Sequence, residues 1–137
     1  DKFEPGTPNV AGAIGFGAAL KWVKEIGVES CAKLESELAE EATNRLTELG
    51  GTRIIGNAPG KAGIVSFVLE QAHPHDVGTI LDSDGVAVRS GHHCCQPLLH
   101  AFGVPATTRA SFAAYSDRKD VDALITGVQK VQRIFGN

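Results

Sequence analysis

The sequence lacks several features that would narrow its class at once. Among its 137 residues no apolar run reaches the ~18–20 residues that span a bilayer, because glycines interrupt the longest candidate, Val10 to Leu20. Lysine and arginine form no block and the formal net charge is −3, so nothing indicates a nucleic-acid surface. The sequence therefore predicts neither a membrane segment nor a nucleic-acid partner.

Cysteine is also scarce. The chain has three cysteines, an odd number, and two of them, Cys94 and Cys95, are adjacent. This usage argues against a secreted disulfide framework and favours a reducing compartment. No basic-then-apolar leader is visible, so we expect a cytoplasmic protein. Because the sequence begins at Asp1 without methionine, a lost leader or upstream sequence remains open.

Hydrophobic periodicity predicts an α+β fold. The chain is long enough and, at 42% hydrophobic residues, apolar enough to bury one core. We expect helices at about 10–26, 29–49, 74–81, 96–102 and, capped by Ser116, 117–135, with strands at 52–55, 64–69, 86–89 and 107–112. This order favours a small, mostly antiparallel sheet covered by helices. Residues 10–137 then form a single domain, and the Pro- and Gly-rich residues 1–9 lead into it.

The segment Arg89 to Pro97 is the most informative stretch, since it reads Arg-Ser-Gly-His-His-Cys-Cys-Gln-Pro between a predicted strand and a predicted helix. A guanidinium, an imidazolium or a helix N-terminus each favours the nucleophilic thiolate form of a nearby cysteine. Spacing alone does not say which of Cys94 and Cys95 is reactive, and His92 and His93 either orient the loop or move protons. By contrast, Cys31 is expected on the buried face of a helix as a small hydrophobe.

A metal site is the competing interpretation of the same cluster. Imidazole and thiolate are common zinc ligands, but four contiguous residues seldom converge on one tetrahedral ion. A second ligand pair is also missing, because the remaining histidines, His73, His75 and His100, are isolated from the cluster. We therefore predict no metal site.

Two further positions have anion-binding chemistry. Arg109 lies within a predicted strand of small and apolar residues, where an unpaired guanidinium is costly to bury. Its partner is either a carboxylate of the chain or the carboxylate of a substrate, for which arginine offers a bidentate clamp. Gly6 and Thr7 form a turn close to a helix start, which suits a phosphate contact but is also common in ordinary turns.

Taken together, three motifs resemble a known family. They are Phe3-Glu4-Pro5-Gly6-Thr7-Pro8-Asn9, Arg89-Ser90-Gly91-His92-His93-Cys94 and Arg109-Ala110-Ser111-Phe112-Ala113-Ala114-Tyr115. In this order they resemble the C-terminal part of SUF-type (group II) cysteine desulfurases and selenocysteine lyases, in the class-V aminotransferase family. The resemblance implies the small C-terminal domain of a fold-type I enzyme that uses pyridoxal 5'-phosphate (PLP). It also implies conversion of L-cysteine or L-selenocysteine to L-alanine, with sulfur left as a persulfide and passed to an acceptor protein for iron–sulfur cluster assembly.

The same resemblance assigns roles to residues. Cys94 matches the nucleophile, Arg109 the arginine that binds the substrate carboxylate, and Arg89 and His93 line the same site. Gly6 and Thr7 match the element that reaches the cofactor phosphate of the other subunit in a homodimer.

Two departures from the family pattern stand out. Cys95 occupies a position that is usually small or apolar, and we expect it to be inert rather than a second sulfur acceptor. The lysine that holds PLP belongs to a large N-terminal domain that these residues do not include, so we expect the chain alone to be inactive. The alternative function is a non-enzymatic thiol module that carries or accepts sulfur.

Overall fold

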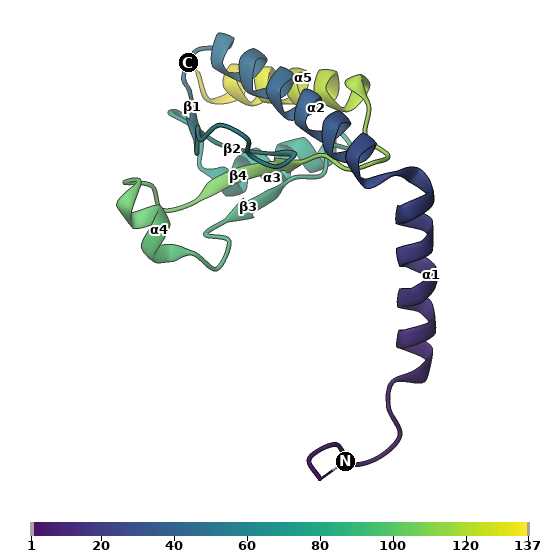
Figure 1. Ribbon diagram of the computed structural model, residues 1–137. Helices are drawn as coiled ribbons and strands as arrows, with labels where there is room; N and C mark the ends of the chain where they lie inside the picture. The colour runs from purple at the N-terminus through teal and green to yellow at the C-terminus, as the bar shows by residue number, and fades with distance from the viewer. Residues whose placement is uncertain (1, 137) are drawn as a thin grey trace. The chain divides into compact units, whose positions relative to one another are not determined.

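The computed structural model describes residues 2–136 (Figure 1). Its helices and strands are α1 (Val10–Ile26), α2 (Val28–Glu48), β1 (Thr52–Ile55), β2 (Ile64–Leu69), α3 (Pro74–Ser83), β3 (Arg89–Gly91), α4 (Gln96–Ala101), β4 (Thr107–Ser111) and α5 (Arg118–Phe135). None of these helices is both long and apolar enough to cross a membrane.

Contacts divide the chain into two units, one that ends at Cys31 and one that begins at Ala32. The first contains α1, whose N-terminus is capped where the side chain of Asn9 accepts a hydrogen bond from the Gly12 N–H at 2.9 Å. Gly27, with φ of +94°, ends the helix. The boundary that we expect between residues 9 and 10 stays a prediction.

The second unit is built on an antiparallel sheet in the order β1-β2-β4-β3. Strand β2 alternates between faces, with Val65, Phe67 and Leu69 buried on one side. Helices α2, α3 and α5 supply the rest of this core, and Figure 1 shows α2 and α5 side by side over the sheet. The predicted α+β fold with a small antiparallel sheet is confirmed.

The cap of α5 differs from the prediction. Asp117, not Ser116, accepts the Lys119 N–H, and the Asp120 carboxylate accepts the Asp117 N–H, which completes a capping box. The Ser116 hydroxyl instead accepts the Ala113 N–H at 3.1 Å. A carboxylate at the positive end of the helix is the better cap here because it also interacts with the helix dipole.

The third strand is shorter and later than expected. Instead of residues 86–89, β3 comprises Arg89–Gly91, because the Val86 N–H donates to the Leu81 carbonyl and closes the turn after α3. The strand packs tightly on that helix: a Cβ added at Gly78 would lie 2.5 Å from the Ser90 hydroxyl. Glycine at this position therefore lets α3 approach the strand that carries Arg89.

Cys31 is partly exposed, which corrects the buried position that periodicity predicts. The buried residues of α2 begin only at Leu38, about two turns further along the helix.

Candidate functional site

The thiol cluster forms a tight turn between β3 and α4. The Cys95 N–H donates to the His92 carbonyl at 2.9 Å, and the two residues between them, His93 and Cys94, have φ of 54° and 57°. Positive φ at both central positions is the signature of a type I′ turn, which normally carries asparagine and glycine. Two side chains held in this region cost about 1–3 kcal/mol each, so other contacts must keep the turn in place.

The turn separates the two thiols. Cys94 is exposed, and its N–H donates to Nδ1 of the His92 ring at 3.1 Å. Cys95 is half-buried, and its Sγ lies 3.1 Å from the His92 carbonyl oxygen, to which the S–H donates. Cys94 is therefore the more exposed of the two thiols, and its role as the reactive one stays a prediction.

His93 joins the turn to β4. Its Nε2 lies 3.2 Å from the Thr107 carbonyl oxygen and 2.9 Å from the Thr107 hydroxyl. Nε2–H donates to the carbonyl, so Nδ1 is the unprotonated nitrogen, and it is buried without a partner. Burial lowers the pKa of His93, and the charges of Arg109, Arg89 and His92 lower it further against the opposing effect of the Thr107 carbonyl.

His93 is therefore neutral near pH 7 and is not one of the cations expected beside the thiol. Sequence reasoning also missed Thr107 as part of the site. The available signal was its position two residues before Arg109, on the same face of the strand.

Arg89 and Arg109 lie directly opposite each other in the β3–β4 ladder. Side chains opposite each other in an antiparallel pair share one face, and like charges there repel. Within residues 2–136 neither guanidinium forms an ion pair, and the buried Nε of Arg109 has no hydrogen-bond partner. Within the described residues Arg109 therefore has no salt bridge to a carboxylate of the chain, which was one of its two expected partners. The two arginines remain as cations that can bind an anion.

The structure thus places Cys94, His93, Arg89 and Arg109 on one β3–turn–β4 segment. Gly6 and Thr7 belong to the first unit. Both are exposed, and Gly6 has φ of +90°. Their role toward a cofactor phosphate stays a prediction.

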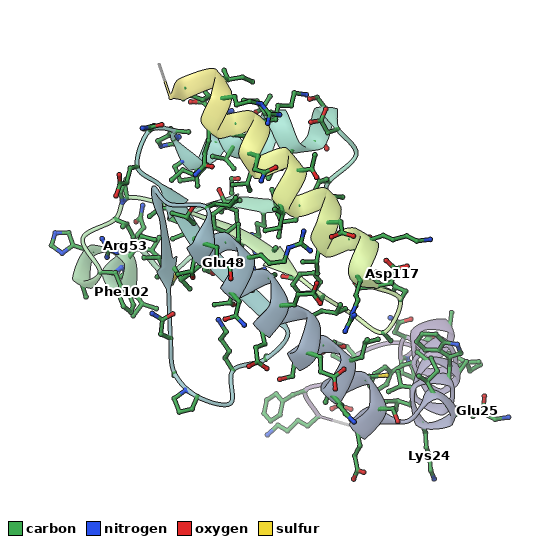
Figure 2. All side chains as sticks on the ribbon, turned by 90° about the horizontal axis from the view of Figure 1, so that it is seen from above. Lys24, Glu25, Glu48, Arg53, Phe102 and Asp117 are labelled. Atoms are coloured by element: carbon green, nitrogen blue, oxygen red, sulfur yellow. The ribbon has the colours of Figure 1, made fainter. Side chains whose placement is uncertain are left out.

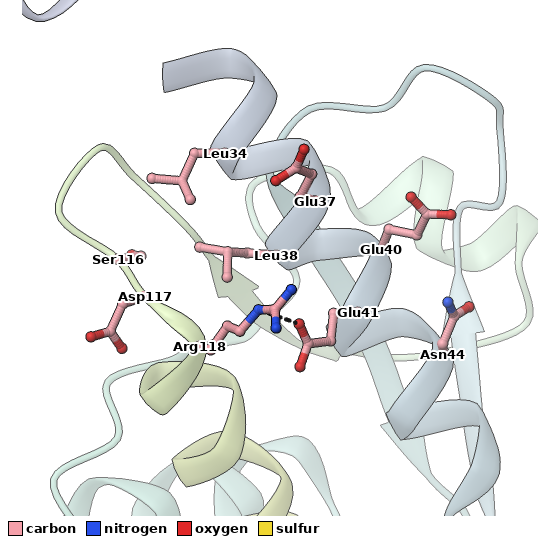
Figure 3. A pocket seen from close by; sticks show the side chains of 9 residues that line it. All are labelled: Leu34, Glu37, Leu38, Glu40, Glu41, Asn44, Ser116, Asp117 and Arg118. Carbon is pink, nitrogen blue, oxygen red and sulfur yellow. Dashed lines mark ion pairs between the residues drawn. The ribbon is translucent and has the colours of Figure 1, made fainter. Parts of the chain in front are cut away.

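A pocket lies between α2 and the start of α5, apart from the thiol turn. This pocket of about 530 Å³ is bordered by Glu37, Glu41 and Asp117. The Arg118 guanidinium lies 3.5 Å from the Glu41 carboxylate, and a dashed line marks this ion pair in Figure 3. These side chains do not include the thiols or Arg89 and Arg109. Residues 2–136 also contain no group of three histidine, cysteine, aspartate or glutamate side chains arranged to hold a metal.

Comparison with known proteins relates the chain to class-V aminotransferases and, among them, to proteins named as cysteine desulfurases. The family model for class-V aminotransferases matches residues 1–124. A probable cysteine desulfurase of Halalkalibacterium halodurans is 51% identical over 136 residues, which are 99% of this chain and 33% of that protein. A cysteine desulfurase of Synechococcus elongatus is 44% identical over 96% of this chain and 21% of its own length.

Solved structures of similar proteins have the same fold as this chain. The crystal structure of a cysteine desulfurase from Escherichia coli superimposes with a TM-score of 0.90 and 37% identity, over 98% of this chain and 33% of that one. A NifS-like protein of Rickettsia africae shares the fold, with a TM-score of 0.80 at 19% identity over 94% of this chain and 36% of that one. The chain spans about a third of the first relatives that it matches.

Proposed function

Because the chain belongs to the class-V aminotransferase family, we propose that it is the C-terminal part of a cysteine desulfurase of the SUF type. Such an enzyme is a PLP-dependent transferase that converts L-cysteine, or L-selenocysteine, to L-alanine. The relatives named as cysteine desulfurases, each about three times as long as the matched segment, support this proposal. We also propose that the intact enzyme is a cytoplasmic homodimer that supplies sulfur for iron–sulfur clusters.

The observation that carries the proposal is the pair of guanidiniums without an ion-pair partner on β3 and β4, with an exposed thiol in the turn that follows β3. Arg109 binds the carboxylate of the substrate through two parallel N–H bonds, and Arg89, directly across the ladder, adds a second positive charge. His93, neutral and anchored to Thr107, lines the site without competing for that anion. The substrate sulfur is then delivered to Cys94.

The sulfur step needs no external oxidant. The Cys94 thiolate attacks the sulfur of the bound cysteine, a new S–S bond forms, and the C–S bond of the substrate breaks. The electron pair of that bond passes to the substrate, which takes up a proton and leaves as alanine. Cys94 is left as a persulfide, so the sulfur is oxidised while the carbon is reduced.

We propose that the residues of this chain do not hold PLP by themselves. A Cβ at Gly6 would meet no atom within 4 Å, so the Gly6–Thr7 turn forms no closed cradle by itself. When bound, PLP supplies the electron sink for this chemistry. We propose that residues beyond these 137 hold the cofactor, with Gly6 and Thr7 contacting its phosphate across the dimer.

The test uses the full-length, PLP-loaded enzyme. Cys94→Ala is expected to abolish alanine formation and the persulfide while leaving the cofactor absorbance intact, because the thiol reacts with sulfur and does not bind PLP. Cys95→Ala is the matched control and is expected to retain activity. A persulfide found on Cys95, with alanine still produced by Cys94→Ala, would overturn the assignment. Persulfide uptake from a donor by the 137-residue chain alone would favour the thiol-carrier alternative.

A further inference from the structure

The thiol turn, residues 92–95, is strained and is tied to β4 by one side chain. His93 and Cys94 both have positive φ, a backbone region that residues with a side chain adopt only when other contacts hold them there. The N–H groups of Cys94 and Cys95 bond back to His92 and so remain within the turn. Within residues 2–136, only the His93 side chain forms a hydrogen bond from this turn to β4. This contact therefore holds the turn against the sheet.

Helix α4, which follows the turn, has its own attachment to the sheet. The carbonyl of Cys95 accepts the Leu99 N–H at 3.2 Å, so the helix starts directly at the turn. At the other end of α4, the Arg53 guanidinium of β1 donates to the Phe102 carbonyl at 2.6 Å, and Figure 2 labels both residues. The far end of this segment is therefore fixed to β1, whereas its near end depends on His93.

Thr107 is the residue that receives His93. It lies opposite Gly91 in the last pair of the β3–β4 ladder, and β4 pairs with β2 along its other edge. Thr107 is only 1% exposed, so its hydroxyl cannot turn to solvent. Both of its oxygens face the ring, the hydroxyl at 2.9 Å and the carbonyl at 3.2 Å from Nε2. A residue in a strand that is paired on both edges gives His93 a rigid anchor.

The hydroxyl of Thr107 is the closer of the two contacts. Nitrogen and oxygen approach to 2.9 Å in a hydrogen bond, whereas non-bonded carbon atoms need about 3.5–4.0 Å. A methyl group in place of the hydroxyl would therefore push the His93 ring away by about 0.6 Å or more. Cys94 follows His93 directly, so a shift of the ring is passed to the residue with the exposed thiol. A misplacement of about 1 Å can cost about 100-fold in rate.

We propose that Thr107 is a positioning residue for the reaction at Cys94. Its hydroxyl holds His93, His93 holds the strained turn, and the turn presents the thiol to the sulfur of the bound cysteine. This role rests on the proposed desulfurase function. Arg109, proposed above to bind the substrate carboxylate, is held separately by the pairing of β4 with β2 and β3. Loss of the Thr107 hydroxyl therefore slows the sulfur step without weakening substrate binding.

The experiment follows the first turnover of the full-length, PLP-loaded enzyme, in which alanine and the Cys94 persulfide form together. Thr107→Val is expected to lower the maximal rate of this turnover at least about fivefold, because the methyl displaces the His93 ring. The L-cysteine concentration that gives half the maximal rate should stay within about twofold, and the cofactor absorbance should not change. Thr107→Ser keeps the hydroxyl and should retain the rate of the unsubstituted enzyme to within about twofold.

Thr108→Val is the matched control. Thr108 is also buried, at 0% exposure, but its hydroxyl donates to the Pro74 carbonyl at 3.4 Å, on the other face of β4. Each valine variant removes one buried hydroxyl that has a partner, so both lose stability for the same reason. Only Thr107→Val should slow the turnover. Equal slowing by Thr108→Val would mean a general loosening of β4 and would overturn the proposal.

A double-mutant cycle tests whether Thr107 acts through His93. In a His93→Leu background no imidazole remains to be held, so Thr107→Val should cause no further loss of rate. Losses that multiply in the double variant would contradict the role. If Thr107→Val fails to fold, Thr107→Ala takes its place, since it removes the hydroxyl without a methyl against the ring, and slowing is again expected.

The remaining outcomes are distinct. An unchanged rate in Thr107→Val, or a slow Thr107→Ser, would refute the role of the hydroxyl. A higher half-saturating L-cysteine concentration at an unchanged maximal rate would place the effect on substrate binding, which also refutes it. If the unsubstituted enzyme forms no alanine, the proposed function fails first, before any variant is compared.

Discussion

Arg89 and Arg109 lie directly opposite each other on β3 and β4. We therefore expect that replacing one of them stabilises the fold, whereas most mutations destabilise it. Like charges directly opposite each other in a sheet destabilise it by about 0.2–1 kcal/mol. Replacing Arg89 with glutamine removes this repulsion, so Arg89→Gln is expected to raise the free energy of unfolding of the 137-residue chain by that amount. Most surface substitutions leave stability unchanged or lower it.

Arg109 carries a second cost, since its buried Nε has no partner. An unsatisfied buried donor costs about 1–3 kcal/mol, and the lower half of that range applies here because the residue is partly exposed. Arg109→Met keeps the apolar stem and removes both penalties, so we expect a gain of roughly 1–3 kcal/mol. For a chain of this length each kcal/mol corresponds to roughly 3–5 °C in Tm.

The assay is a double-mutant cycle in urea. Because the repulsion can be relieved only once, the gain of the double variant should fall short of the sum of the single gains by about 0.2–1 kcal/mol, and the shortfall should shrink in about 1 M salt. Arg133→Gln is the control, since Arg133 lies in the last turn of α5 and its loss is expected to lower stability slightly. Destabilisation by Arg89→Gln, or strict additivity at low salt, would refute the reasoning.

The remaining predictions concern His93 and the start of α5. Because burial lowers the pKa of His93 below the ordinary 6.5, the unfolded chain binds more protons just below pH 6.5, and the free energy of unfolding falls as the pH drops through this window. Chemical denaturation of His93→Gln between about pH 5 and 8 should show a flatter dependence, and identical slopes would contradict the assignment. At the helix start, Asp117→Ala is expected to cost about 0.5–2 kcal/mol because it removes the cap, whereas Ser116→Ala should cost less. If thermal melts show that Ser116→Ala lowers the Tm more than Asp117→Ala does, Ser116 is the N-cap and this assignment is wrong.

Long elements were predictable from the sequence because their signals are local. The helical period of Val121, Leu124, Val128 and Val131 and the apolar run of β2 each specify an element from neighbouring residues. Predictions failed at element ends, where the outcome depends on a single competing bond. Val86 is one case, because its N–H donates to the Leu81 carbonyl and β3 begins only at Arg89.

The sequence by itself determined that Arg89, two histidines and two thiols share the segment Arg89 to Pro97, and their residue types predict a reactive thiol there. It connected Arg109 with that segment only through the family resemblance. Only the tertiary structure decided that Cys94 is the exposed thiol and that Cys95 donates to a carbonyl, because the turn aims adjacent side chains differently. The β3–β4 register alone places Arg89 opposite Arg109. The neutrality of His93 likewise depends on its contact with Thr107 and on burial, which residues distant in the chain create together.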